Sequence, residues 1–412
     1  MQPDRRKDIL LSRNLTAYLV SRFCSGVAMT LLRAAIAWHV FALSHSAFHL
    51  GLIGLVQFLP ALFLTLVGGA VADTYDRRKV CMIAQTIPLA CCGVLFATTQ
   101  RGTVSLELLY GMILLVAVAQ TFANPARAAL LPSLVPRESF PRAVTVVSTV
   151  QALAFVSGPT ACGFLIAAAG IGMAYGAYEL LALGSLLGLA FLRPAATDGP
   201  RRAMSWEAVR DGLRFVRRQP VVLGCMALDM FAVIFGGATA LLPIYAIDIL
   251  KVGARGYGVL SASLEAGALV SALAMLTLPP IRRAGSALLI AVTVYGAATI
   301  VFGLSHWFPL SVVAYGLVGM ADQVSVVMRG TAIQLSTPDD LRGRVSAVNF
   351  LFIGASNQVG AAESGFVAAL TSAPFAVVSG GVGCLLVVAI VAAKLPALRA
   401  YRTNELAVAN AG

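Results

Sequence analysis

The sequence predicts an all-α membrane protein with twelve transmembrane helices. Of its 412 residues, 59% are hydrophobic and 12% are charged, and the mean hydropathy is +0.86. This composition is too apolar for a water-soluble protein. Apolar runs long enough to cross about 30 Å of hydrocarbon as helices recur through nearly the whole chain. They lack the alternating polarity of β-barrel strands, which need only about 10 residues each.

The spans follow one another with short interruptions, except near the middle of the chain. Each expected helix starts where a polar or turn-forming segment gives way to an apolar run and ends at the next such segment. In order, the expected spans are 15-44, 49-72, 79-99, 104-126, 143-169, 172-193, 221-249, 257-279, 286-305, 308-331, 345-370 and 375-394. The polar, basic start of the chain precedes an apolar run too long for a signal core, so we expect the first helix to be retained.

Lysine and arginine residues gather on alternate sides of these spans. With the N-terminus placed in the cytoplasm, 24 of them fall in cytoplasmic segments and 3 in outer loops, while Arg22, Arg33 and Arg329 fall within helices. Cytoplasmic loops carry this excess in membrane proteins. We therefore expect a multi-pass membrane protein with both termini in the cytoplasm. The net charge of +12 then reflects topology, and we expect no nucleic-acid partner.

One long interruption divides the chain into two halves. We expect an N-terminal six-helix bundle over 1-193, a cytoplasmic linker over 194-220, and a C-terminal six-helix bundle with a short tail over 221-412. The linker carries SWEAVRDGLRFVRRQP, whose apolar residues fall at helical spacing among arginines. Two alternatives remain for it: an amphipathic helix on the inner membrane surface, or a solvated linker helix.

The two halves contain a weak internal repeat. RAALLPSLVPRESFPRAV from Arg127 aligns without gaps with RGTAIQLSTPDDLRGRVS from Arg329, and Arg142 then matches Arg344. Chance could produce a few such matches, but their shared order and loop context favour gene duplication. Six helices plus six, joined by a linker, is an arrangement typical of transporters whose halves rock about a central site.

The stretch VGGAVADTYDRRKV lies in the expected cytoplasmic turn after the second span. Its Gly69, Asp73, Arg77 and Arg78 resemble the loop signature Gly-x-x-x-Asp-(Arg/Lys)-x-Gly-(Arg/Lys)-(Arg/Lys) of the major facilitator superfamily. Asp76 stands where the signature usually has glycine. An acidic residue there is typical of the subfamily that includes the enterobactin exporter and macrolide-efflux proteins, which the chain resembles in this respect. Thr74 departs from the signature because it stands where a cation is usual.

The resemblance covers nearly the whole chain and implies a fold of two pseudo-symmetric six-helix bundles. Other stretches that look like the subfamily are RNLTAYLVSRF, FANPARAALLPSLVPRE, FAVIFGGATALLPIYAIDIL and STPDDLRGRVSAVN. The resemblance to the superfamily also implies that the signature loop stabilises the outward-facing state of the transporter. By charge alone, Asp73 can pair with Arg127 or with a helix N-terminus and act as a latch. Arg77, Arg78 and Lys79 can contact anionic lipid headgroups, although anchoring of the topology explains Lys79 equally well.

The fifth expected span contains SGPTACGF. Gly158, Pro159 and Gly163 resemble the antiporter signature Gly-Pro-x-x-Gly-Gly, with Cys162 in place of its first final glycine and Ala154 in place of an upstream glycine. This partial match implies efflux. Close helix packing through small residues is the alternative explanation.

Ionisable side chains inside the expected spans are functional candidates because a charge in hydrocarbon costs several kcal/mol, about 3 on insertion scales. They are Arg33, Asp229, Glu265, Asp322 and Glu363. Burial favours the neutral form of a carboxyl group and a nearby arginine favours the ionised form, so alternating access can drive proton binding and release. Arg33 is a candidate counter-ion or anchor for an anionic substrate. Static ion pairs between helices are the alternative for each residue, and Arg329 or Asp322 can meet partners on the first, seventh or eleventh span.

The sequence lacks a Walker loop, a nucleophile elbow and an HExxH motif, so we expect a protein that is not an enzyme. Its cysteines and histidines lack metal-site spacing, and we expect no cofactor. The favoured function is secondary export of an amphipathic organic molecule, siderophore-like or drug-like, in exchange for protons. The expected partners are a small-molecule substrate, protons and anionic lipids, with the chain acting as a monomer. Import or facilitated diffusion by the same fold, and a non-transporting membrane sensor or lipid-handling protein, remain alternatives.

Overall fold

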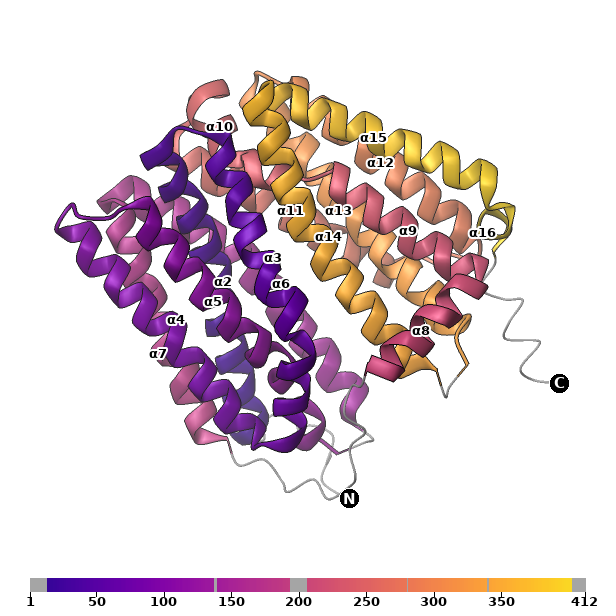
Figure 1. The fold of residues 1–412 in the computed structure, drawn as a ribbon, viewed down its shortest axis with the longest axis horizontal. Coiled ribbons are helices and arrows are strands. Elements are labelled where there is room, and N and C mark those ends of the chain that lie inside the picture. The colour runs from indigo at the N-terminus through magenta and orange to yellow at the C-terminus, as the bar shows by residue number, and fades with distance from the viewer. Residues whose placement is uncertain (1–12, 137–138, 193–205, 280, 339–340, 402–412) are drawn as a thin grey trace. The chain divides into compact units, whose positions relative to one another are not determined.

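The computed structural model describes residues 13–136, 139–192, 206–279, 281–338 and 341–401. Within these ranges the regular elements are helices (Figure 1). The long ones are α2 (Arg13–Ser44), α3 (Ala47–Thr74), α4 (Arg77–Gln100), α5 (Leu106–Ala128), α6 (Phe140–Ala169), α7 (Ile171–Phe191), α8 (Trp206–Arg218), α9 (Pro220–Phe235), α11 (Gly253–Thr277), α12 (Ala284–Leu304), α13 (Phe308–Leu335), α14 (Arg342–Leu370) and α15 (Ala373–Lys394). The short ones are η1 (Leu131–Ser133), η3 (Ala238–Leu241), α10 (Leu242–Ile244), η4 (Tyr245–Ile249) and α16 (Pro396–Ala400).

Eleven of the described helical segments are long and apolar enough to cross a membrane. The predicted all-helical membrane fold is therefore confirmed. The expected span at 345-370 is also a continuous helix, α14, but polar side chains such as Asn349, Asn357 and Gln358 make it less apolar than the others. A helix of its 29 residues is about 43 Å long, which still exceeds the thickness of the hydrocarbon layer.

Local signals set the helix ends. The carboxylate of Asp76 caps α4 by accepting hydrogen bonds from the backbone N–H groups of Arg78, at 2.9 Å, and Lys79, at 3.4 Å. Ser105 caps α5 in the same way, through the N–H of Leu108. Gly170 separates α6 from α7 with a φ of 80°, a conformation that glycine adopts without steric cost.

The helices form two compact units. The first comprises Met1–Ser44 with Leu59–Met204, and the second comprises His45–Phe58 with Ser205–Gly412. In the first unit α2 packs against α6 and α7, and α4 packs against α5 and α7. Small residues allow the close approach of α2 and α7: a Cβ atom added at Gly188 would lie 2.9 Å from the backbone oxygen of Ala17. Such contacts hold helices together in lipid, where apolar burial gives little driving force.

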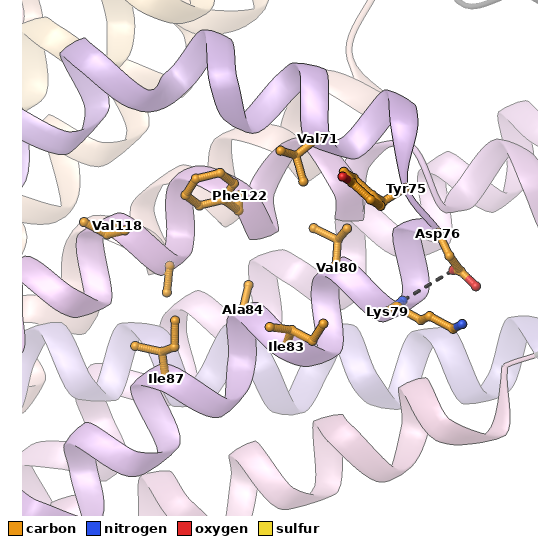
Figure 2. A pocket seen from close by; sticks show the side chains of 11 residues that line it. Val71, Tyr75, Asp76, Lys79, Val80, Ile83, Ala84, Ile87, Val118 and Phe122 are labelled. Atoms are coloured by element: carbon orange, nitrogen blue, oxygen red, sulfur yellow. Dashed lines mark hydrogen bonds between the residues drawn. The ribbon is translucent and has the colours of Figure 1, made fainter.

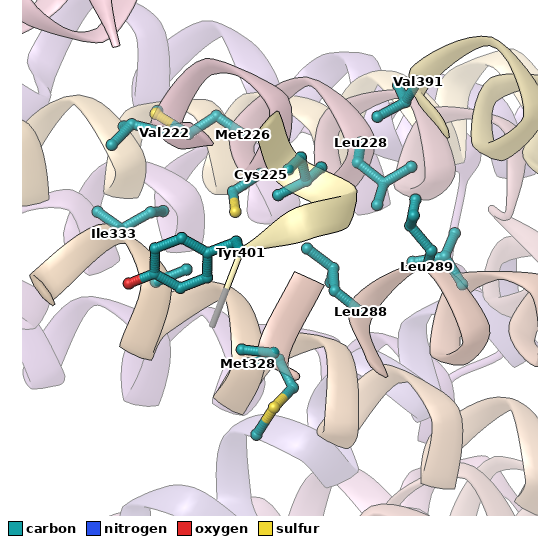
Figure 3. Packing of buried hydrophobic residues seen from close by; sticks show 14 of the residues in the cluster. Val222, Cys225, Met226, Leu228, Leu288, Leu289, Met328, Ile333, Val391 and Tyr401 are labelled. Carbon is teal, nitrogen blue, oxygen red and sulfur yellow. The ribbon is translucent and has the colours of Figure 1, made fainter. Parts of the chain in front are cut away.

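In the second unit α12 packs against α13 and α15, α11 packs against α13, and α9 lies between α14 and α15. Its core contains side chains from α9, α12, α13 and α15, including Leu228, Leu288 and Met328 (Figure 3). Leu398 of α16 and Tyr401 close this core after the last long helix.

Helix α8 packs in the second unit against α14 and α9. Leu213 and Val216 join the apolar core, and Asp211 pairs with Arg344 of α14 at 3.2 Å. The expected linker helix is therefore present, and its Leu213 and Val216 pack on the second unit. The linker residues 194–205 and the side chains of Trp206 and Val209 lie outside the described part of the structure.

The expected span over 221-249 is present as the helical segment Pro220–Ile249, but it is not one continuous α-helix. Helix α9 ends at Phe235 and is followed by Gly236 and Gly237, the 3₁₀ turn η3, the short α10 and the π-helix η4. Two adjacent glycines give little helix propensity, and Pro243 cannot donate a backbone hydrogen bond. The break leaves backbone groups free for side chains of neighbouring helices.

Candidate functional site

A buried cation organises the first unit. Arg127, near the end of α5, is 8% exposed. Its Nη1 donates to Ser25 Oγ of α2 at 2.7 Å, and its Nη2 donates to Gln85 Oε1 of α4 at 3.3 Å. The hydroxyl of Tyr18 donates to the Arg127 carbonyl oxygen at 3.3 Å. These partners are neutral dipoles, so they solvate the charge without neutralising it.

The network continues from Gln85 to α7. Ser185 Oγ donates to Gln85 Oε1 at 3.2 Å, and Gln85 Nε2 donates to the carbonyl oxygen of Ala182 at 3.2 Å. Ser185 and Ser21 share a further hydrogen bond of 3.0 Å. The sequence interpretation missed this network. A polar glutamine within the apolar run of α4 was the signal that could have revealed it.

The signature loop lies between α3 and α4. Arg77 donates to the carbonyl oxygen of Ala129 at 2.7 Å, and Arg78 donates to that of Ala190 at 2.6 Å. Both acceptors lie at the C-terminal ends of helices, α5 and α7, where a cation is favoured. Two arginines of the signature thus fasten three helices of the first unit.

Two other residues of the signature, Gly69 and Asp73, lie on α3. Gly69 is buried but has open space where a Cβ would lie, whereas a Cβ at Gly68 would meet the Thr121 backbone of α5. The close approach of α3 to α5 therefore depends on Gly68. Asp73 lies in the last turns of α3, but its side chain is outside the described part of the structure, so its latch role stays a prediction.

The antiporter-like segment packs α6 against α2. A Cβ added at Gly158 would lie 2.8 Å from the carbonyl oxygen of Val27, and one added at Gly26 would lie 2.9 Å from Ala154 Cβ. Gly158, Pro159 and Gly163 are all buried. The segment thus has the packing role that its small residues predict, and its role in efflux remains a prediction.

The second unit holds a buried ion pair. Arg329 of α13 is 4% exposed, Asp229 of α9 is 8% exposed, and the guanidinium contacts the carboxylate directly. Arg329 is the repeat partner of Arg127, 202 residues later. Arg127 reaches α2 and Arg329 reaches α9, but one meets a serine and the other a carboxylate.

A cluster of polar side chains surrounds the break after α9. Tyr295 of α12 donates its hydroxyl to the carbonyl oxygen of Gly236 at 3.1 Å. Thr239 of η3 and Tyr315 of α13 share a hydrogen bond of 2.7 Å. The half-buried Asp322 lies near enough to act electrostatically on both tyrosines. We call Thr239, Tyr295, Tyr315 and Asp322 the break cluster.

Two further carboxylates flank the break cluster. Glu265 of α11 acts electrostatically on Tyr315. Glu363 of α14 accepts a hydrogen bond from Ser364 at 3.3 Å, and Ser364 Oγ lies 2.5 Å from the place of a Cβ at Gly237. The second unit therefore gathers three of the four candidate carboxylates around the break and holds the fourth, Asp229, in an ion pair.

Two cations singled out from the sequence lie elsewhere. Arg33 is exposed on α2. Arg344, at the start of α14, pairs with Asp211 of α8, a partner that the sequence interpretation did not propose.

A model of the family described as transmembrane secretion effector matches residues 16–410. The chain is 29% identical over 392 residues to the enterobactin exporter EntS of Escherichia coli O1:K1, a match that covers 94% of this chain and 92% of that protein. EntS of Escherichia fergusonii matches to the same extent.

Solved structures share the fold at low sequence identity. A transporter of the POT family in complex with a thioalcohol-conjugated peptide has a TM-score of 0.73 at 12% identity and covers 94% of this chain and 96% of its own. A mutant of the nucleoside transporter NupG has a TM-score of 0.72 at 12% identity, covering 92% and 99%. An inward-facing bacterial homologue of the lysosomal transporter Spinster has a TM-score of 0.67 at 15% identity, covering 97% of each chain.

Proposed function

The chain belongs to the transmembrane secretion effector family of the major facilitator superfamily, and from this premise we propose that it exports an amphipathic organic molecule, siderophore-like or drug-like, in exchange for protons. The observation that carries the direction of transport is the match to enterobactin exporters along 94% of the chain. A catecholate siderophore is therefore the first substrate to test.

The break cluster supports the proton-coupled part of the proposal. A carboxyl group that carries a proton must be able to exist in both forms, and a fixed guanidinium partner holds it ionised. Asp229 has such a partner in Arg329. Among the described residues, no cation lies within ion-pairing distance of Asp322, which instead acts electrostatically on Tyr295 and Tyr315. Asp322 is thus the favoured proton carrier, with Glu363 and Glu265 next.

Alternating access between the two halves completes the proposed mechanism. The halves are those proposed from the sequence, 1-193 and 221-412, and the signature loop with Asp73 would stabilise one of the two states. Arg33 would anchor an anionic part of the substrate. We place the protein in the bacterial inner membrane as a monomer with both termini in the cytoplasm, where its basic loops face anionic lipids.

Inside-out membrane vesicles test the function. An imposed pH gradient, acidic inside, should drive accumulation of a labelled catecholate siderophore in vesicles that contain the protein and not in vesicles without it. Equilibration that ignores the gradient would instead indicate facilitated diffusion. Binding of the siderophore without any movement would indicate a sensor and overturn the proposal.

A further inference from the structure

An apolar groove of about 500 Å³ opens in the first unit, where the signature loop joins α3 to α4 (Figure 2). Its walls come from α3, α4 and α5, with Val80, Ile83 and Ile87 along α4 and Val118 and Phe122 along α5. Ile83 is 66% exposed. Exposed apolar walls in a membrane protein are solvated by hydrocarbon, so an acyl chain is the chemical class that fits this groove.

The groove runs inward from the loop along α4. From Lys79 at its mouth to Ile87 at its inner end, eight residues of helix rise about 12 Å. The hydrocarbon of one leaflet is about 15 Å thick, half of a bilayer core. The groove therefore has the depth of a single leaflet and accommodates most of one acyl chain.

The polar groups at the mouth of the groove are Tyr75, Asp76 and Lys79. The carboxylate of Asp76 is engaged in capping α4. Of the three consecutive cations, Lys79 is the one that lines the groove, whereas Arg77 and Arg78 point to carbonyl groups of α5 and α7. Lys79 is exposed, and among the described residues no acceptor lies within hydrogen-bonding distance of its Nζ. Its ammonium is therefore placed to contact an anionic headgroup at the mouth of the groove.

We propose that this groove binds one anionic phospholipid of the leaflet on the signature-loop side, with an acyl chain along α4 and α5 and the phosphate on the Lys79 ammonium. A single lysine near a membrane surface contributes about 1 kcal/mol to binding an anionic lipid, which corresponds to about fivefold in affinity. The site is independent of the proposed transport function, because lipid binding can be measured without a substrate or a gradient.

Native mass spectrometry of the purified full chain in detergent tests the site. The probes are phosphatidylglycerol and phosphatidylcholine with identical acyl chains. The wild-type protein should retain one phosphatidylglycerol about fivefold more strongly than phosphatidylcholine, and Lys79→Gln should remove this preference. Lys394→Gln, which changes an exposed lysine at the end of α15, is the matched control and should keep it.

The acyl-chain part of the site has its own variants. Ile87→Trp should fill the inner end of the groove and weaken retention of both lipids, and Val118→Trp tests the same region from α5 if the first variant fails to fold. Leu180→Trp, at a residue of α7 that is 74% exposed and outside the groove, should change neither. The proposal is overturned if Lys79→Gln keeps the preference, if folded groove variants retain lipid normally, or if inorganic phosphate alone displaces the phosphatidylglycerol.

Discussion

In the second unit the guanidinium group of Arg329 pairs with the carboxylate of Asp229, and both side chains are more than nine-tenths buried. The pair joins α13 to α9 just before α9 ends, so it fixes the helix whose continuation is broken. Removing one partner would leave an uncompensated charge in a site that has little access to water.

We predict that Asp229→Asn lowers the free energy of unfolding by about 3 to 5 kcal/mol, the cost of breaking a buried ion pair. The double variant Asp229→Asn with Arg329→Gln should recover part of this loss because no charge then remains unpaired. Thermal unfolding of the detergent-solubilised protein measures both. Equal melting temperatures for the wild-type protein and Asp229→Asn would show that the pair does not stabilise the second unit.

A second prediction concerns Gln85. Gln85→Leu removes the acceptor of Arg127 Nη2 and of the Ser185 hydroxyl. The Ser185 hydroxyl can still donate to Ser21, but Arg127 Nη2 loses its acceptor. A buried donor left without a partner costs about 1 to 3 kcal/mol, and more when it is charged, so the melting temperature should fall clearly. Thr86→Ala is the control, because its exposed hydroxyl bonds within its own helix, to Ile83. Equal melting temperatures for Gln85→Leu and Thr86→Ala would show that the hydrogen bonds of Gln85 do not stabilise the first unit.

A third prediction concerns the packing of α6 on α2. Gly158→Ala adds a Cβ that would lie 2.8 Å from the Val27 carbonyl oxygen, closer than such contacts allow, so the helices must separate and the yield of folded protein should drop. Gly111→Ala is the matched change, because nothing lies within 4 Å of the added atom and alanine favours helix by roughly 0.5 to 1 kcal/mol. Size-exclusion profiles after detergent extraction should rank Gly111→Ala at or above the wild type.

A fourth prediction concerns the signature loop. Asp73→Asn should slow transport without reducing membrane insertion, because the latch needs the charge and the helix does not. Asp248→Asn, at an exposed position of η4, should leave the rate unchanged. Initial rates in vesicles, divided by the amount of inserted protein, make the comparison. Unchanged turnover in Asp73→Asn would remove the latch role.

Much of the fold follows from the sequence, because the length of the apolar runs locates the transmembrane helices and the lysine and arginine residues locate the cytoplasmic loops. The repeat also pointed to Arg127 and Arg329 as equivalent residues, and both are buried in corresponding helices. The sequence did not show that Ser25 and Gln85 surround one of them while Asp229 pairs with the other. That difference depends on which helix faces are in contact, and hydrophobic periodicity is weak in helices that are apolar on all sides.

The break after Phe235 was also not predicted, although Gly236 and Gly237 are plain in the sequence. Paired glycines occur in many continuous membrane helices, because neighbouring helices can satisfy the backbone. Contacts with other helices stabilise the break here. Tyr295 of α12 donates to the Gly236 carbonyl oxygen, and Gly237 lies against Ser364 of α14. The hydropathy of the sequence does not show which side chains of other helices contact this segment.

Proton movement coupled to the substrate tests the central claim most directly. In proteoliposomes with a pH-sensitive dye inside, addition of a catecholate siderophore should produce a proton flux with the wild-type protein and with Glu107→Gln, a control at the exposed start of α5. Asp322→Asn should lower this flux at least tenfold, a loss of about 1.4 kcal/mol or more in coupling, while still exchanging labelled for unlabelled siderophore. Siderophore transport without any proton flux in the wild-type protein, or an undiminished flux in Asp322→Asn, Glu265→Gln and Glu363→Gln alike, would contradict the account.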